Sequence, residues 1–245
     1  MSALQPSLRH RLSRHALVLV CSGYTLISHA QSLCSSADTP LAQGLFERFI
    51  SADCVPCWRD PATAVPPVNA LAVDWIAPGK LGDAAPLSVA AIQEATDRLH
   101  ELGRQNLEGA SHNYSAFKNW PGTQLTVAFG RTVGRYVGVS VELAVAQNTT
   151  SLPDLDLWLL LLEQLPSGTE GSAVPRHLVR NVLQLRWGED ALKADAKGVH
   201  LSELRPMSLP EGTQSQRLQV AAWVQDAQGN LIQAAHTACA PRDAL

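Results

Sequence analysis

The second half of the chain consists largely of short segments in which apolar and polar residues alternate. A period of two is typical of β-strands with one buried face, whereas an amphipathic helix requires a period of 3.6 residues. No helical pattern separates these segments, and Asp226–Gly229 provides a hairpin turn between the last two. The segments are 135–146, 154–165, 177–187, 216–226 and 230–238. They predict a small antiparallel β-sandwich over residues 131–245.

The first half of the mature chain has a mixed pattern. The predicted strands are 44–51, 69–77 and 120–130. Residues 86–103 are predicted to form an amphipathic helix, and a loop is expected between this helix and the strand at 120. Asp53 is expected to cap the N-terminus of a shorter helix, which Pro61 ends. The order strand, helix, strand, helix, strand predicts an α/β domain over residues 31–130.

Residues 1–30 are predicted to be a signal peptide. Three arginines without any acid precede a short apolar run, and cleavage is expected after Ala30. An N-terminal membrane anchor is the disfavoured alternative, because the apolar run is shorter than the roughly 20 residues that a membrane-spanning helix needs. Removal of these three arginines leaves 16 basic and 22 acidic residues, a net charge of −6. We therefore expect a periplasmic or secreted protein that binds no nucleic acid and has no membrane span in its mature chain.

Four cysteines remain in the mature chain, namely Cys34, Cys54, Cys57 and Cys239. Three pairings are possible. The most economical pairing joins Cys54 to Cys57 and Cys34 to Cys239, so that the second disulfide ties the two ends of the mature chain together. The alternative that all four cysteines are simply structural remains open.

The close pair occurs in Cys54-Val55-Pro56-Cys57, between a predicted strand and a predicted helix. This is the arrangement of thioredoxin, in which the N–H groups of the helix start stabilise the thiolate of the first cysteine. Cys54 would then attack a substrate disulfide, and Cys57 would resolve the mixed disulfide. A zinc site is disfavoured, because the sequence has no second C-x-x-C and its histidines are scattered singly. No metal and no cofactor are expected.

Four stretches of the sequence occur in the order seen in a known family. They are "LFERFISADCVPC", "ALAVDWIAPGKLGD", "GTEGSAVPRHLVRNVLQLRWG" and "VAAWVQDAQGNLIQAAH". Over most of residues 44–236 the chain resembles a family of secreted bacterial proteins that is catalogued as a domain of unknown function and is thioredoxin-like. The resemblance implies a thioredoxin-like half with a C-x-x-C, followed by a β-rich half, in the bacterial periplasm or outside the cell. It implies no particular substrate.

Two further residues are candidates for a role beside the dithiol. Thioredoxin-like folds place a cis-proline directly before a strand that faces the dithiol, and Pro121 is the best candidate for it. Asp74, in "AVDW", is a candidate for assisting proton transfer if it is buried near the dithiol. A residue at such a position more often caps the end of a strand.

Two functions therefore remain for comparison with the structure. The leading hypothesis is an exported protein with a thioredoxin-like domain (31–130) and a β-sandwich (131–245). Its redox-active Cys54–Cys57 pair would exchange with thiol- or disulfide-bearing exported proteins. The alternative is a non-catalytic periplasmic binding or assembly module in which both disulfides are structural.

Overall fold

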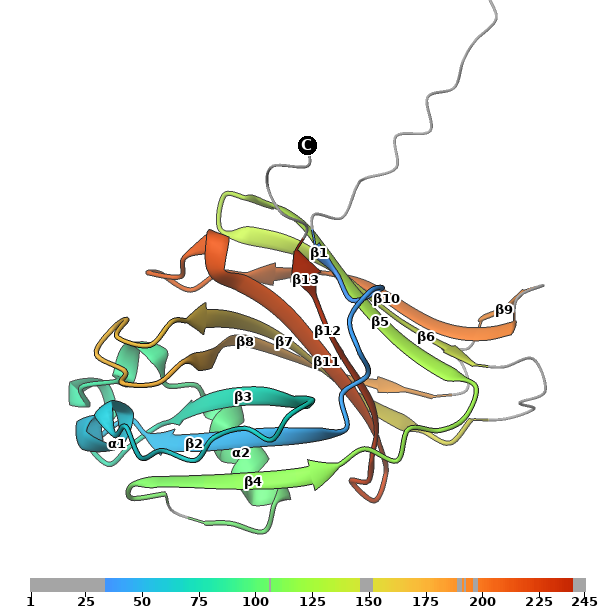
Figure 1. The fold of residues 1–245 in the computed structure, drawn as a ribbon. Helices are drawn as coiled ribbons and strands as arrows, with labels where there is room; N and C mark the ends of the chain where they lie inside the picture. The colour runs from blue at the N-terminus through green and yellow to red at the C-terminus, as the bar shows by residue number, and fades with distance from the viewer. Residues whose placement is uncertain are drawn as a thin grey trace, which may run out of the picture. The chain divides into compact units, whose positions relative to one another are not determined.

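The protein is described by a computed structural model over residues 34–105, 107–145, 152–188, 191, 193–195 and 198–239 (Figure 1). The signal peptide predicted at residues 1–30 lies outside the described residues. The described residues all belong to one compact unit, Gln31–Leu245. Most of their regular structure is β-strand.

The elements follow one another along the chain with few helices between strands. The strands are β1 (Cys34–Ser35), β2 (Gly44–Ser51), β3 (Ala70–Ala77), β4 (Ala110–Ala116), β5 (Thr123–Val133), β6 (Tyr136–Val145), β7 (Leu155–Leu165), β8 (Arg176–Trp187), β9 (Lys193–Asp195), β10 (Gly198–Ser208), β11 (Leu218–Asp226), β12 (Leu231–His236) and β13 (Ala238–Cys239). The α-helices in the described residues are α1 (Val55–Arg59) and α2 (Gln93–Glu101). Short 3₁₀ turns occupy Gly82–Ala84, Ser88–Ala90 and Ser215–Arg217.

These strands form two sheets. The seven-stranded sheet has the order β12-β11-β7-β8-β3-β2-β4, and the six-stranded sheet has the order β13-β1-β5-β6-β10-β9. In the first sheet β2 pairs in parallel with β3 and β3 in parallel with β8, while the other pairs are antiparallel. The hairpin expected at Asp226–Gly229 is present between β11 and β12, where the Gly229 N–H donates to the Asp226 carbonyl.

The expected fold class, a thioredoxin-like α/β domain followed by a separate β-sandwich, is wrong. Each sheet takes strands from both sides of residue 131, so the expected division at that residue does not correspond to the sheets. The helical pattern over 86–103 yields an α-helix only at Gln93–Glu101, and the expected loop before residue 120 contains β4. Local periodicity identified most strands, but contacts between distant segments decided which strands share a sheet.

The two sheets pack face to face over part of their area. Strands β5 and β6 alternate between buried and exposed residues, as expected for a sheet with one solvated face. Strand β7 is almost wholly buried, because its two faces lie in different core clusters. Leu157, Leu159 and Leu161 join the cluster shared with the six-stranded sheet, whereas Leu160 and Leu162 join the cluster beneath α2.

Helix α2 is attached to the seven-stranded sheet by a buried arginine. Arg98 forms a two-pronged ion pair with Glu47 of β2, at 2.9 and 3.0 Å. Its guanidinium lies 5.4 Å from the ring centroids of both Trp158 and Trp223, which stack on each other. This combination of a satisfied charge and aromatic packing fixes the helix on one face of the sheet.

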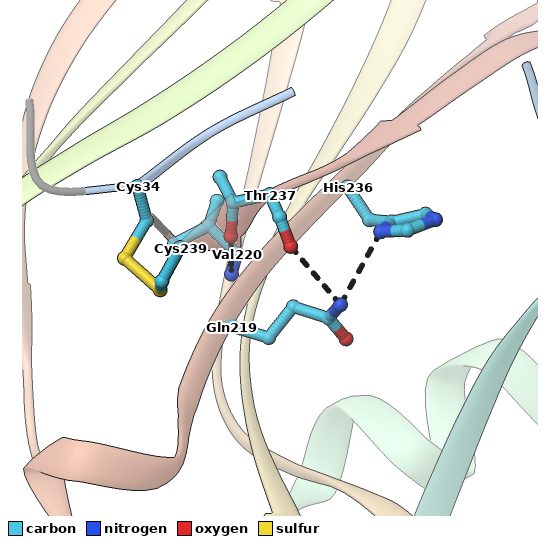
Figure 2. The surroundings of a disulfide bond; sticks show 6 residues. All are labelled: Cys34, Gln219, Val220, His236, Thr237 and Cys239. Carbon is cyan, nitrogen blue, oxygen red and sulfur yellow. Dashed lines mark hydrogen bonds between the residues drawn. A yellow bond between two sulfur atoms is a disulfide. The ribbon is translucent and has the colours of Figure 1, made fainter. Parts of the chain in front are cut away.

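The two ends of the described chain meet at a disulfide (Figure 2). Cys34 of β1 and Cys239 of β13 are direct neighbours in an antiparallel strand pair, and their Cα atoms are 4.0 Å apart. The structure also joins Cys54 to Cys57. Both disulfides of the most economical pairing are therefore present.

Candidate functional site

The Cys54–Cys57 disulfide lies at the junction between β2 and α1. Strand β2 ends at Ser51, and Cys54 is the N-cap of α1. The Cys57 N–H donates a hydrogen bond to the Cys54 Sγ atom at 3.2 Å. Both cysteines are half-buried, and Cys57 packs against the buried side chain of Trp58 and its neighbours.

Helix α1 has only five residues. It ends at Arg59, and Asp60 has extended backbone angles immediately before Pro61. A residue before proline is disfavoured in the helical region, which explains why the helix ends here. The prediction that Pro61 ends the helix is confirmed. So short a helix has a small dipole, and the Cys57 amide is therefore the specific contact that can stabilise a negative sulfur at Cys54.

Asp53 does not cap α1, contrary to the expectation. Its carboxylate accepts hydrogen bonds from the backbone N–H groups of Lys80, at 2.7 Å, and Leu81, at 3.3 Å. A Cβ atom on Gly79 would overlap this carboxylate, so the close approach requires glycine there. Asp53 therefore fixes the loop after β3 against the chain that enters the disulfide.

Asp74 is completely buried on β3 and binds two arginines. Its carboxylate accepts from Arg48 at 2.6 and 2.8 Å, from Arg176 at 3.2 Å and from the His177 N–H at 2.7 Å. The carboxylate is thus engaged by ion pairs and a backbone donor and makes no hydrogen bond to either cysteine of the close pair. Its connection to the disulfide is indirect.

Arg176 provides that connection. Its Nη2 donates to the carbonyl of Trp58 in α1 at 3.0 Å, and its guanidinium lies 5.0 Å from the Trp58 ring centroid. Burial and the nearby Arg48 lower the pKa of Arg176, whereas Asp74 opposes this effect. The buried Asp74–Arg176 pair therefore holds the helix that carries Cys57.

Pro121 is not beside the dithiol. Peptide bonds of the described residues are all trans, so Pro121 is not a cis-proline. It follows β4, which begins next to the disulfide and has seven residues. At about 3.3 Å per residue, this strand carries the chain roughly 20 Å away before Pro121. The proline lies in the turn that leads into β5 of the other sheet.

Gly109, directly before β4, approaches the disulfide from a distant part of the chain. A Cβ atom on Gly109 would lie 3.7 Å from the Cys57 Sγ atom. The sequence did not indicate this neighbour, because the segment before residue 120 has the composition of a loop. The stretch "ASHNYSA" consists of small and polar residues with a single tyrosine, so it lacks the apolar alternation of a half-buried strand.

Two clefts flank this part of the sheet, one on each face. The first has a volume of about 230 Å³ and is lined by residues of α2, including Leu99, and by the exposed ion pair of Lys80 and Glu108. The second has a volume of about 290 Å³ and is lined by Asp60, by residues 62–64 and by the first residues of β4, including His112. Glu108 and Ala110 line opposite clefts, and Gly109 between them faces the disulfide sulfur.

The comparisons with known proteins show no family. No protein-family model matches the chain, and no curated protein matches it in sequence. Among solved structures, the chain is similar to HBP35 of Porphyromonas gingivalis, with a TM-score of 0.49 and 11% identity over 80% of this chain and 74% of that one. It is also similar to a domain of the outer membrane lipoprotein Omp28 from Porphyromonas gingivalis, with a TM-score of 0.33 and 15% identity over 52% and 98% of the respective chains. Neither likeness is close enough to bring an activity.

Two observations bear on the cellular location. The described residues contain two disulfides, which are consistent with an exported protein. Within the same residues, no helix is both long and apolar enough to cross a membrane.

Proposed function

We propose that this protein exchanges disulfides with the thiols or disulfides of other exported proteins through Cys54 and Cys57. The observation that carries the proposal is the hydrogen bond from the Cys57 N–H to the Cys54 Sγ. A backbone donor at this position stabilises a thiolate on Cys54 more than a neutral thiol, and the thiolate is the reactive form. Both cysteines are half-buried, so part of each side chain is open to an incoming sulfur, and the two clefts lie on either side of the neighbouring Gly109.

The exchange transfers two electrons from the Cys54–Cys57 dithiol to the substrate disulfide. A reduced Cys54 thiolate attacks one sulfur of a substrate disulfide, and the other substrate sulfur leaves as a thiolate that takes a proton from water. The Cys57 thiol, after losing its proton, attacks the Cys54 sulfur of the mixed disulfide. The second substrate thiol leaves and the Cys54–Cys57 disulfide forms. The reverse sequence oxidises a substrate dithiol and returns the pair to the reduced state.

Asp74 and Arg176 act in this proposal as positioning residues. Arg176 binds the carbonyl of Trp58, the residue after Cys57, and Asp74 holds Arg176 in place. A fixed α1 keeps the Cys57 sulfur within reach of the mixed disulfide. Proton transfer by Asp74, the candidate role that the sequence raised, finds no support in its contacts.

The rival function is a binding or assembly module with two structural disulfides. The packing of Cys57 against the apolar cluster around Trp58 favours it, because a buried disulfide sulfur reacts slowly. Under both functions we propose export by the signal peptide at residues 1–30, to the periplasm or beyond the cell. The resemblance to secreted bacterial proteins stays a prediction.

The reduction potential of the Cys54–Cys57 pair distinguishes the two functions. For the exchange function we expect a potential above about −270 mV, within the range of thiol-disulfide oxidoreductases, and reduction of insulin by the dithiol form. A potential below about −300 mV, typical of structural disulfides, would contradict it. The Cys54→Ser variant should lose insulin reduction, whereas a Cys34→Ala/Cys239→Ala variant that remains folded should keep it.

A further inference from the structure

Strand β4 forms one edge of the seven-stranded sheet. In the described residues its only strand neighbour is β2. Edge strands of natural proteins are commonly protected by lysine, proline or a bulge, because their free backbone groups can pair with another chain. The sequence of β4, "ASHNYSA", contains neither lysine nor proline, and its pairing with β2 has no bulge.

The direction of the β4 backbone groups follows from the hydrogen bonds at its two ends. The Ser51 N–H donates to the Gly109 carbonyl, and the Phe117 N–H donates to the Gln43 carbonyl. In an antiparallel pair such hydrogen-bonded positions alternate with positions whose N–H and C=O point away from the partner. The odd-numbered residues from 109 to 117 therefore face β2. The even-numbered residues of β4 point their backbone groups outward, and these are Ala110, His112, Tyr114 and Ala116.

One side-chain contact agrees with this assignment. The Arg104 guanidinium reaches the His112 carbonyl at 3.0 Å, which requires that carbonyl to point away from β2. The outward N–H groups of Ala110, Tyr114 and Ala116 have no hydrogen-bond partner among the described residues. An added strand would thus find free donors at both ends and at the centre of the edge.

The edge also begins beside the candidate reactive disulfide. Gly109, one residue before β4, faces the Cys57 Sγ atom. The two clefts lie on opposite faces of the sheet at this same end, with Glu108 lining one and Ala110 the other. Because side chains of an extended strand alternate between two faces, a strand added here would direct successive side chains toward the two clefts.

We propose that β4 is the docking site for an extended, cysteine-containing segment of a substrate polypeptide, which adds as a further strand to the sheet. The proposal rests on the exchange function and names its substrate class. Alternating outward N–H and C=O groups are complementary to a polypeptide backbone and to few other ligands, which identifies the occupant as a peptide segment. The covalent step is the exchange already described, with the substrate cysteine sulfur delivered to the Cys54–Cys57 pair.

A binding experiment tests the docking site without any sulfur chemistry. The probe is a fluorescein-labelled nine-residue peptide of alternating threonine and valine with a central serine. We choose side chains without charge because the clefts carry charges of both signs. Tyr114→Pro removes the outward N–H at the centre of β4 and leaves the hydrogen bonds to β2 intact. Tyr114→Ala is the matched control, because it removes the same side chain and keeps the N–H.

We expect anisotropy titrations to show peptide binding to the wild type and to Tyr114→Ala, and at least about tenfold weaker binding to Tyr114→Pro.

If circular dichroism shows that Tyr114→Pro does not fold, N-methylated peptides with the wild-type protein replace this variant. Methyl groups on alternate amides should abolish binding when they lie on one edge of the peptide and should be tolerated on the other. Equal binding of the two N-methylated peptides, or no binding of the parent peptide to the wild type, would overturn the proposal. A wild-type dimer that dissociates in Tyr114→Pro, without peptide binding, would instead show that β4 pairs with a second copy.

A kinetic experiment separates the docking site from the exchange function. Here the central serine of the peptide is replaced by cysteine, and its reaction with the Cys54–Cys57 disulfide is compared with that of dithiothreitol. We expect Tyr114→Pro to slow the peptide about tenfold and to leave dithiothreitol unaffected. An equal peptide rate in the variant and the wild type would contradict docking and leave the exchange function intact. Peptide binding that depends on the Tyr114 amide, without reaction of either thiol, would contradict the exchange function and leave the docking site intact.

Discussion

The Cys34–Cys239 disulfide joins residues 205 positions apart, whereas the Cys54–Cys57 disulfide joins residues three positions apart. The first links β1 to β13 within a sheet, next to β5, where Cys34 is buried and Cys239 is exposed. The second is half-buried at the start of a five-residue helix. A long loop restricts the unfolded chain strongly and a short loop restricts it little. The Cys34–Cys239 disulfide should therefore contribute more to stability, whereas the Cys54–Cys57 disulfide is the one proposed to react.

Removal of each disulfide tests this comparison most directly. In the chain-entropy model, Cys34→Ala/Cys239→Ala should lower the free energy of unfolding by about 5 kcal/mol, and Cys54→Ala/Cys57→Ala by about 2 kcal/mol. Urea unfolding of both double variants and the wild type measures the difference. Equal losses, or a larger loss for the close pair, would break the comparison.

Because the Cys54–Cys57 disulfide closes only a short loop, the helix α1 beside it must be held mainly by other contacts, of which Arg176 makes two. Arg176→Met leaves Asp74 buried with one arginine fewer and frees the Trp58 carbonyl. We expect a loss of about 3–5 kcal/mol in the free energy of unfolding, and easier reduction of the Cys54–Cys57 disulfide.

The matched control for Arg176 is Arg186→Met, which removes an exposed arginine paired with Asp154. An exposed pair contributes little, so this variant should be indistinguishable from the wild type in unfolding and in reduction. A stable Arg176→Met protein with an unchanged reduction potential would show that α1 is held by other contacts.

A smaller effect is expected from two histidines, His177 and His236, that share contacts with the Gln219 side chain. The Gln219 amide contacts the Nδ1 atoms of His177 and His236. Its Nε2 atom, which contacts His236, also donates to the Thr237 carbonyl (Figure 2). Because Nε2 is a donor, the Nδ1 atom of His236 must accept, which requires the unprotonated form of that nitrogen. Burial lowers the pKa of both histidines, and the nearby His177 adds to this effect at His236, while Asp74 opposes it at His177.

The sign of the pH dependence follows from these lowered values. Above the pKa of about 6.5 that histidines have in the unfolded chain, the two histidines are neutral in both the folded and the unfolded protein, and the free energy of unfolding is at its full value. As the pH falls below that value the unfolded chain binds protons first, so the free energy of unfolding decreases until the folded histidines also titrate. Unfolding of the wild type and of His177→Gln/His236→Gln between pH 7.5 and pH 5 (chosen on either side of about 6.5) checks this. The decrease should be smaller in the variant, and an equal decrease would exclude these histidines as its source.

The smallest expected effect concerns Asp53, next to Cys54. Asn in place of Asp53 removes a negative charge near the sulfur and keeps a carbonyl oxygen for the Lys80 N–H. We expect the reduced Asp53→Asn variant to react with iodoacetamide at neutral pH faster than the wild type, by less than about threefold, because more Cys54 is thiolate. Asp60→Asn, beyond the end of α1, serves as the control and should change nothing. A slower reaction in Asp53→Asn would show that the Asp53 bonds to the loop at residues 80–81 matter more than its charge.

Local features of the sequence were sufficient to locate most strands and the turn at Asp226. Strand β2 begins and ends where its apolar pattern does, and β7, β8, β11 and β12 lie within one or two residues of the alternating segments. The even number of cysteines and their positions also indicated the observed pairing. These features depend on neighbours in the sequence, and a pattern of period two records which face of a strand is buried.

Tertiary structure alone decided how the strands combine and what the candidate site contains. Besides β7, strand β8 pairs with β3, from the other half of the chain, and no local pattern specifies such a pairing. The carboxylate of Asp53 binds a loop rather than its own helix, and Asp74 is linked to α1 through Arg176. Strand β4, without an apolar alternation of its own, is a strand because β2 pairs with it. Each of these outcomes depends on residues that are distant in sequence, which is why neither propensity nor spacing could have supplied them.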